Sequence, residues 1–133
     1  MTEVYKNATQ VQYIYKQLFN DVQTANPKSM DSITKSKMVI RFRLTEPAVD
    51  MWVDGRSKPV YAYFGAQDIK PTITATMTAN TLHEILLGTL PLGKAMSAHR
   101  LRVSGSMLKL FKLEDLLHKC QSQYPAIAKE YFG

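Results

Sequence analysis

Residues 71–77, PTITATM, alternate apolar and threonine side chains without interruption. A period of two is the spacing of a β-strand, whose successive side chains point to opposite faces of a sheet. The alternation gives two faces: Ile73, Ala75 and Met77 on one, and Thr72, Thr74 and Thr76 on the other. The segment therefore predicts a strand with one covered face and one wettable face, and such a strand needs neighbouring strands and a covering layer.

Four other segments are predicted to be strands, with ranges 38–44, 49–54, 59–64 and 100–104. The first alternates apolar residues with Val39, Arg41 and Arg43, as a half-buried strand does. Turn signals follow the second at Asp54-Gly55 and the third at Gly65. Because short turns join the first three segments, an antiparallel meander is expected.

Helical spacing is found on both sides of these strands. An N-terminal stripe of apolar residues recurs every three or four positions and ends before Asn26-Pro27. A second helix is predicted after Thr78 or Asn80, and it ends near Gly88. Pro91 is suited to begin a further turn, and the last helix is predicted after Ser106. Residues 121–133 are expected to be a tail with a break at Tyr124-Pro125.

This order of elements predicts an α+β fold with one mainly antiparallel sheet covered on one face by helices. With 133 residues, no repeat and no linker, the chain is expected to form a single domain over residues 1–133. The start of the chain shows no secretory signal, and one cysteine, Cys120, fits a reducing cytoplasm. The net charge of +6 favours contact with anions. Seven methionines suit adaptable walls around an apolar guest.

The ordered pattern resembles the sterol carrier protein type two family, the non-specific lipid-transfer proteins. The resemblance is carried by two runs, DIKPTITATMTANTLHEILLG (Asp68–Gly88) and RLRVSGSMLKLFKLEDLL (Arg100–Leu117). The first predicted strand and Trp52 in VDMWVDG fit the earlier part of the family pattern, so roughly residues 35–120 are covered. Two positions depart from the pattern: His99 stands where the family usually has Gly, and Ser106 where it often has Asp.

The resemblance implies a five-stranded sheet with helices on one face and an apolar tunnel between sheet and helices. It implies non-covalent binding of fatty acid, fatty acyl-CoA, sterol or phospholipid, with no cofactor. Burial contributes about 0.8 kcal/mol per CH₂, so a sixteen-carbon tail offers on the order of 12 kcal/mol before the costs of association. The protein must then supply a void of a few hundred Å³.

The candidate walls of this tunnel are apolar residues on the covered side of the sheet and on the helices that follow it. They are Trp52, Phe64, Met77, Leu82, Leu86, Leu90, Met96, Met107 and Phe111. If the family's strand order holds, the threonine face is flanked by four arginines, Arg41, Arg43, Arg100 and Arg102. This basic face is a candidate contact for acidic headgroups at a membrane surface.

Three other functions compete with a lipid carrier. A small cone-fold isomerase would need a carboxylate base and hydroxyl donors, for which Asp54, Tyr61, Tyr63 and Asp68 are the candidates. A pure interaction module would use the apolar surplus around Met107, Leu108 and Phe111 as a dimer or partner interface. Nucleic-acid binding is disfavoured because the basic residues are dispersed.

Nucleophilic catalysis and metal binding have weaker sequence support. Cys120 and His118 are two residues apart, a spacing that does not bring them face to face on a helix. Cys120 is therefore interpreted as a structural cysteine. No ligand-type spacing links His83, His99 and His118, so no metal site is predicted.

Overall fold

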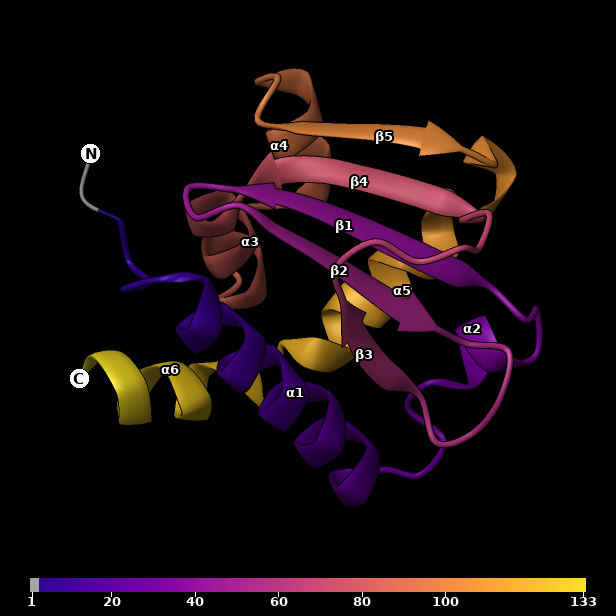
Figure 1. The fold of residues 1–133 in the computed structure, drawn as a ribbon, viewed down its shortest axis with the longest axis horizontal. Coiled ribbons are helices and arrows are strands. Elements are labelled where there is room, and N and C mark those ends of the chain that lie inside the picture. The colour runs from indigo at the N-terminus through magenta and orange to yellow at the C-terminus, as the bar shows by residue number, and fades with distance from the viewer. Residues whose placement is uncertain (1–2) are drawn as a thin grey trace.

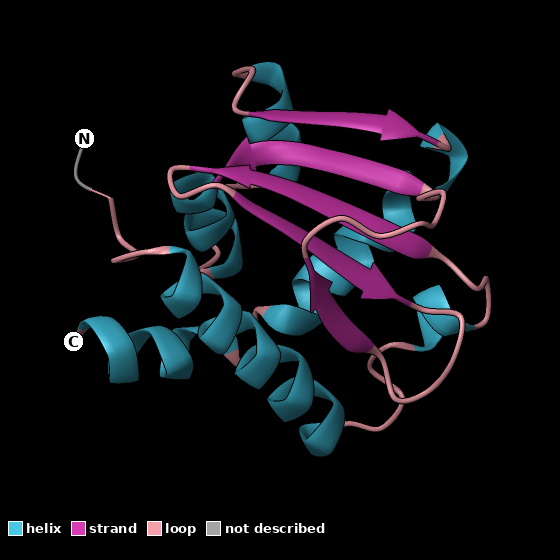
Figure 2. Ribbon diagram, viewed as in Figure 1, coloured by secondary structure: helices cyan, strands magenta, loops and turns pink. Residues whose placement is uncertain are grey.

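The computed structural model describes residues 3–133, which form one five-stranded sheet and its covering helices (Figures 1 and 2). The elements in chain order are α1 (Ala8–Ala25), α2 (Asp31–Thr34), β1 (Val39–Thr45), β2 (Val49–Asp54), β3 (Tyr61–Phe64), β4 (Ile73–Thr78), α3 (Ala79–Leu86), α4 (Leu92–Ser97), β5 (Leu101–Gly105), the 3₁₀ turn η1 (Met107–Lys109), α5 (Leu110–Cys120) and α6 (Tyr124–Phe132). The predicted α+β class and its mainly antiparallel sheet are confirmed.

The strand order is β3-β2-β1-β4-β5, so β4 lies between β1 and β5 as the resemblance implied. β1 and β4 are parallel, whereas the other neighbouring strands are antiparallel. The alternation in β4 is as predicted, with Ile73, Ala75 and Met77 buried and the intervening threonines partly exposed. In β1 the residues opposite them across the ladder, Ile40, Phe42 and Leu44, are buried on the same face.

The helices cover one face of the sheet. Figure 1 shows α3 and α5 behind the strands, while α1 lies beside β3 at one edge and contacts α6. Val11, Tyr15, Leu18 and Val22 of the predicted stripe, with the neighbouring Ile14, are buried on α1, and so is Phe19. The core therefore lies between this helical layer and the inner face of β1, β2 and β4.

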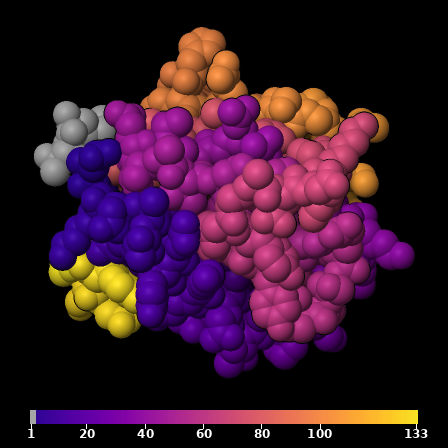
Figure 3. Space-filling model, in the orientation of Figure 1, coloured from indigo at the N-terminus to yellow at the C-terminus, as the bar shows by residue number. Residues whose placement is uncertain are grey.

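The opposite, outer face of the sheet is crossed by the segment that joins β3 to β4. This segment must pass β2 and β1 because β4 is on the far side of both, and Figure 3 shows it over the middle of the sheet. Trp52 lies on this outer face, since it pairs with Arg41 in a register where Met51 and Val53 face the core. The Arg41 guanidinium lies 4.8 Å from the centre of the Trp52 ring. Trp52 is consequently buried on the outer face and cannot line a tunnel under the helices.

Two consecutive helices end with the same hydrogen-bond pattern. After α3, the Gly88 N–H donates to the Ile85 carbonyl and the Thr89 N–H to the Glu84 carbonyl. After α4, the His99 N–H donates to the Met96 carbonyl and the Arg100 N–H donates to the Ala95 carbonyl. This pattern requires a left-handed residue, and φ is +81° at Gly88 and +58° at His99. The position where the family usually has Gly is therefore one whose backbone favours glycine.

The C-terminal segment differs from the expectation of a tail. Residues Tyr124–Phe132 form α6, with Pro125 in its first turn. Proline is tolerated there because the N–H that it lacks would have no partner within the helix. Tyr124, Ile127 and Ala128 are buried by this helix, so the last residues contribute to the core.

Candidate functional site

The space between the sheet and the helices is nearly filled. A small void of about 10 Å³ lies there, and its lining side chains come from α1, β1, β2, α3 and α5. They are Tyr15, Leu18, Phe19, Phe42, Met51, Leu82, Leu86, Leu116, Leu117 and Cys120. A void of roughly 10–15 Å³ holds about one water molecule, whereas a lipid tail needs hundreds of Å³. We call this place the inner seam; in the described conformation it is closed.

The predicted tunnel walls are distributed over several parts of the fold. Leu82 and Leu86 line the inner seam. Met77 and Leu90 are buried in the core, and Phe64 and Met96 are packed partly against it, but none of these four lines the inner seam.

Three residues of the predicted set lie away from the inner seam. Trp52 faces outward from the sheet, as described above. Met107 in η1 and Phe111 at the start of α5 are exposed to solvent. The segment of η1 and α5 that holds Met107 and Phe111 is apolar over more than one face. Its inward face carries Leu113, Leu116 and Leu117. In the described conformation Trp52, Met107 and Phe111 therefore do not line the inner seam.

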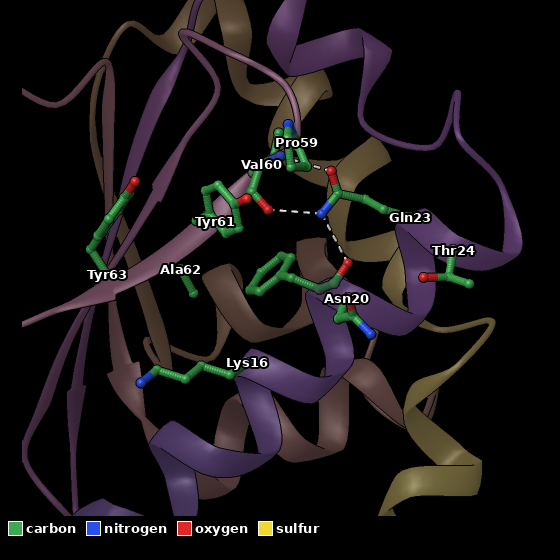
Figure 4. Close-up of a pocket in the computed structure, with 10 residues that line it drawn as sticks. Lys16, Asn20, Gln23, Thr24, Pro59, Val60, Tyr61, Ala62 and Tyr63 are labelled. Atoms are coloured by element: carbon green, nitrogen blue, oxygen red, sulfur yellow. Dashed lines mark hydrogen bonds between the residues drawn. The ribbon is translucent and has the colours of Figure 1, made fainter.

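A larger hollow lies on the surface between α1 and β3 (Figure 4). This groove has a volume of about 700 Å³ and is lined by Lys16, Phe19, Asn20, Gln23, Thr24, Pro59, Val60, Tyr61, Ala62 and Tyr63. Lys16 is the only charged side chain among these lining residues. Its ammonium lies 5.7 Å from the centre of the Phe64 ring. The groove thus combines apolar walls with one cation, an arrangement suited to a tail with an anionic end.

One side chain holds the two sides of this groove together. The Gln23 amide nitrogen on α1 donates to the Val60 carbonyl at 2.7 Å, and the Val60 N–H donates to the Gln23 amide oxygen at 2.8 Å. The same amide nitrogen also donates to the Phe19 carbonyl within α1, at 3.0 Å. Figure 4 shows Gln23 reaching from α1 to Val60. Because β3 is the edge strand, this pair of bonds is a direct link between α1 and the edge of the sheet.

Phe19 lines both the groove and the inner seam. It is buried and lies on the inward face of α1, one turn before Gln23. The Phe19 side chain therefore lies between a surface hollow of about 700 Å³ and the closed interior. Sequence reasoning missed Phe19 because the predicted stripe was drawn through Leu18. The spacing of Phe19 from Tyr15 and Val22, four and three positions, is the signal that could have found it.

The polar groups at the inner seam are held neutral by burial. Desolvation raises the pKa of Tyr15 well above its ordinary value, and it raises the pKa of the Cys120 thiol to about 12. The Tyr15 hydroxyl is hydrogen bonded to the Tyr5 hydroxyl at 2.6 Å. The walls of the inner seam are therefore uncharged at neutral pH, as a hydrocarbon guest requires.

The outer face of the sheet is less basic than the sequence suggested. Arg41 donates through Nε and Nη2 to the two Asp50 carboxylate oxygens, at 2.8 Å each. Arg100 precedes β5 and lines one surface hollow with Thr76 and Arg102, and its guanidinium is paired with Glu84 and Thr81 of α3. Arg43 and Arg102 are exposed and flank Thr76 from the two neighbouring strands.

Comparison with known proteins agrees with this architecture. Residues 19–118 match the SCP-2 sterol transfer family, and this range contains most of the residues that line the inner seam. The chain belongs to the SCP-2 sterol transfer family. No match was found among curated proteins.

Solved sterol carrier proteins share the fold. The apo sterol carrier protein 2 of Yarrowia lipolytica is 18% identical, with a TM-score of 0.65 over 91% of this chain and 98% of that chain. The sterol carrier protein domain 2 of Helicoverpa armigera is 17% identical, with a TM-score of 0.66 over 83% of this chain and 86% of that one. Sterol carrier protein 2 of Aedes aegypti, solved with palmitate, is 24% identical, with a TM-score of 0.55 over 77% and 96%.

The residues considered for isomerase chemistry are not arranged as a catalytic site in this family member. Asp54 accepts hydrogen bonds from the Arg56 guanidinium at 2.7 Å and above, and this pairing lowers the pKa of the Asp54 carboxyl. A general base in an apolar pocket needs a raised pKa instead. Tyr61 and Tyr63 are exposed on the outer side of β3. Within residues 3–133, no three His, Cys, Asp or Glu side chains converge on a possible metal position.

No helix in the described part of this SCP-2 family chain is long and apolar enough to cross a bilayer.

Proposed function

We propose that this chain binds single-chain lipids non-covalently, with the hydrocarbon tail in the inner seam and the polar end in the groove between α1 and β3. The observation that carries the proposal is the position of Phe19, which belongs to the walls of both spaces. Membership of the SCP-2 sterol transfer family supports lipid binding as the general function. The Aedes aegypti relatives solved with palmitate support a fatty acid as a suitable guest.

Binding requires the interior to open, because the inner seam is closed in the described conformation. A sixteen-carbon tail offers on the order of 12 kcal/mol of gross burial energy, which can offset several kcal/mol of lost core packing. Residues that move apart on opening would contact the tail instead of one another. We therefore expect micromolar binding, weaker than a preformed tunnel of the same size would give.

The shape of the entrance favours an unbranched tail over a rigid sterol. Rotation of one ring, Phe19, opens a narrow passage between α1 and β3, whereas a four-ring sterol would also require separation of Gln23 from Val60. Lys16 stands at the groove and can pair with a carboxylate. The preferred ligand class is thus a long-chain fatty acid or a related single-chain anion.

A titration of the purified protein with palmitate and with hexadecanol, followed by calorimetry, tests the proposal. The wild-type protein is expected to bind one molecule of either ligand, with palmitate bound more tightly because it is anionic. Lys16→Glu should weaken palmitate binding by about fivefold or more and leave hexadecanol unchanged. Lys28→Glu changes the net charge equally at an exposed position outside the groove, and it serves as the control.

Two substitutions of Phe19 test the entrance itself. Phe19→Leu leaves a smaller side chain and should speed palmitate association in stopped-flow measurements, whereas Phe19→Trp should slow it. Tyr13→Leu removes an exposed aromatic ring from the same helix and should change neither rate. Failure of the wild-type protein to bind palmitate and hexadecanol would refute the proposed function.

A further inference from the structure

Three large apolar side chains are exposed together where β5 gives way to the last long helix. Met107 and Leu108 lie in η1 and Phe111 lies in the first turn of α5, with exposed fractions of 50%, 89% and 63%. Residues three and four apart on a helical segment are neighbours, so Phe111 lies beside both of the others. We call these three residues the apolar tip. Clustered exposed apolar groups of this kind indicate an interaction site.

Lysines surround the apolar tip. Lys109 and Lys112 belong to the same segment, and the Lys112 ammonium is also 5.8 Å from the centre of the Phe111 ring. A hydrogen bond from Lys112 to the Ser36 hydroxyl brings the exposed Lys35 and Lys37 next to α5. Figure 1 shows α2 at the same end of the molecule as the end of β5.

A fifth lysine, Lys70, lies in the segment before β4, close to η1. The Ser106 N–H donates to the Thr72 carbonyl at 3.0 Å, which places the residues before β4 beside η1. Lys70, two positions before Thr72, is exposed. The ring of lysines is therefore Lys35, Lys37, Lys70, Lys109 and Lys112.

Three carboxylates lie near the lysine ring without neutralising it. Glu114 and Asp115 lie on the next turn of α5, where they line a shallow hollow together with Phe111 and His118, and the Asp115 carboxylate is 3.8 Å from the Lys119 ammonium. Asp68 is exposed two residues before Lys70. Five lysines against three carboxylates leave a positive excess around the apolar tip.

We propose that the apolar tip inserts into the headgroup region of an acidic phospholipid bilayer, with the surrounding lysines on the lipid phosphates. Protruding apolar side chains within a basic ring match a surface that is anionic outside and apolar beneath. A second copy of this chain would bring like charges together. Three side chains also fall far short of the roughly 20–30 residues that each partner contributes to a stable protein interface.

This assignment differs from a membrane contact through the outer face of the sheet. There, Arg41 is bound to Asp50 and Arg100 to Glu84, so half of the arginines expected to meet headgroups already have carboxylate partners. The apolar tip also presents the almost fully exposed Leu108 beside its cations, whereas the large exposed side chains of the outer face are the tyrosines Tyr61 and Tyr63.

Flotation with vesicles of phosphatidylcholine alone, or with about 30% phosphatidylserine, tests the proposal. The wild-type protein should float with the acidic vesicles and much less with the neutral ones, and added salt should reduce the binding. Leu108→Ser combined with Phe111→Ser should reduce binding at least tenfold. Lys109→Glu should reduce it about fivefold or more. The matched control is Tyr13→Ser, which removes an exposed aromatic ring from α1 and should bind as the wild type does.

A fluorescent reporter locates the inserted segment. Phe111→Trp should show a blue-shifted emission and strong quenching by brominated lipids, whereas Tyr13→Trp should show neither. The buried Trp52 supplies a constant background in both variants. Equal quenching of the two reporters, or unchanged flotation of the Leu108/Phe111 double variant, would overturn the proposal.

Sedimentation distinguishes a lipid surface from a second copy of the chain. A wild-type dimer that the Leu108/Phe111 double variant converts to a monomer would also overturn the proposal. Palmitate binding in solution should be unchanged in this double variant, because the apolar tip lies outside the groove and the inner seam. The membrane contact and the proposed function can therefore fail separately.

Discussion

The hydroxyl oxygens of Tyr5 and Tyr124 lie 2.5 Å apart, although 119 positions separate the two residues in the chain. Tyr5 also bonds Tyr15 of α1, and the Tyr124 hydroxyl is 2.6 Å from Nδ1 of His83 on α3. Burial raises the pKa of Tyr5 to about 12, so the hydroxyl stays protonated at neutral pH. This buried chain of hydrogen bonds joins the N-terminal segment, α1, α3 and α6.

Removal of the Tyr124 hydroxyl should destabilise the protein more than removal of the Tyr15 hydroxyl. Tyr124→Phe deprives both Tyr5 and His83 of a partner, whereas Tyr15→Phe affects only Tyr5. A buried polar group without a partner costs about 1–3 kcal/mol. Urea unfolding should therefore show a loss of about 2–4 kcal/mol for Tyr124→Phe. Tyr13→Phe, at an exposed position, should change the free energy of unfolding by less than about 0.5 kcal/mol. An equal loss of unfolding free energy in Tyr13→Phe and Tyr124→Phe would show that these buried hydrogen bonds do not stabilise the fold.

Acidification should weaken the fold through His83. Desolvation lowers the pKa of His83 below its ordinary value, while the nearby Glu84 acts in the opposite direction. The unfolded chain therefore binds a proton more readily than the folded one, and the free energy of unfolding falls as the pH drops below about 6.5. Protonated His83 carries a hydrogen on Nδ1, so the Tyr124 hydroxyl must then accept from His83.

Urea unfolding between pH 7.5 and 5.5 measures this dependence. His83→Gln should make the profile flatter over this range, and His118→Gln, at an exposed position, should leave it as in the wild type. A profile that His83→Gln does not alter would refute the coupling.

His99 should be replaceable by glycine with a gain in stability. Its φ of +58° lies in the left-handed region, which costs a residue with a Cβ about 1–2 kcal/mol. His99→Gly should therefore raise the free energy of unfolding by about 1 kcal/mol, after the greater entropy of glycine in the unfolded chain is subtracted. Gly88→Ala provides the reverse test. A Cβ at this position meets nothing within 4 Å, so the substitution changes only the energy of the left-handed backbone conformation. It should lower stability by about 1 kcal/mol; changes of the same sign in both variants would contradict the argument.

Loss of the Gln23 side chain should loosen the groove. Gln23→Ala leaves the Val60 N–H and carbonyl without these partners, which should cost about 1–3 kcal/mol of stability. The same change should speed palmitate association, because α1 is less firmly held to β3. Stopped-flow mixing with palmitate measures the rate, and Gln12→Ala, on α1 outside the groove, is the control. A slower association in Gln23→Ala would count against an entrance between α1 and β3.

The sheet could be predicted because its alternation is strong. In β4 a methyl or larger apolar group alternates with threonine at every position, and a slip by one residue would bury the threonines. The same reasoning applied to β2 would have placed Trp52 with Asp50 and Asp54, away from Met51 and Val53. The apolar character of Trp52 was given more weight than its register, and the Arg41 guanidinium that lies over its ring comes from the neighbouring strand.

The inner seam could be predicted only in part. Leu82 and Leu86 were identified because one helix face carries them, but the other walls are supplied by α1, β1, β2 and α5. Which of two apolar faces of a helix turns inward depends on tertiary packing, and this is why Phe111 was assigned to the wall while it is exposed. The groove depends on the distance between α1 and β3, which no local pattern specifies.

Nuclear magnetic resonance of the palmitate complex tests the central claim most directly. With ¹³C-labelled leucine methyl groups, the terminal part of the palmitate tail should give intermolecular nuclear Overhauser effects to Leu82, Leu86, Leu116 and Leu117, which line the closed inner seam. The exposed Leu108 should give none. Contacts to Leu108 without contacts to the four inner leucines would show that the tail stays on the surface, and the account of an opening interior would be wrong.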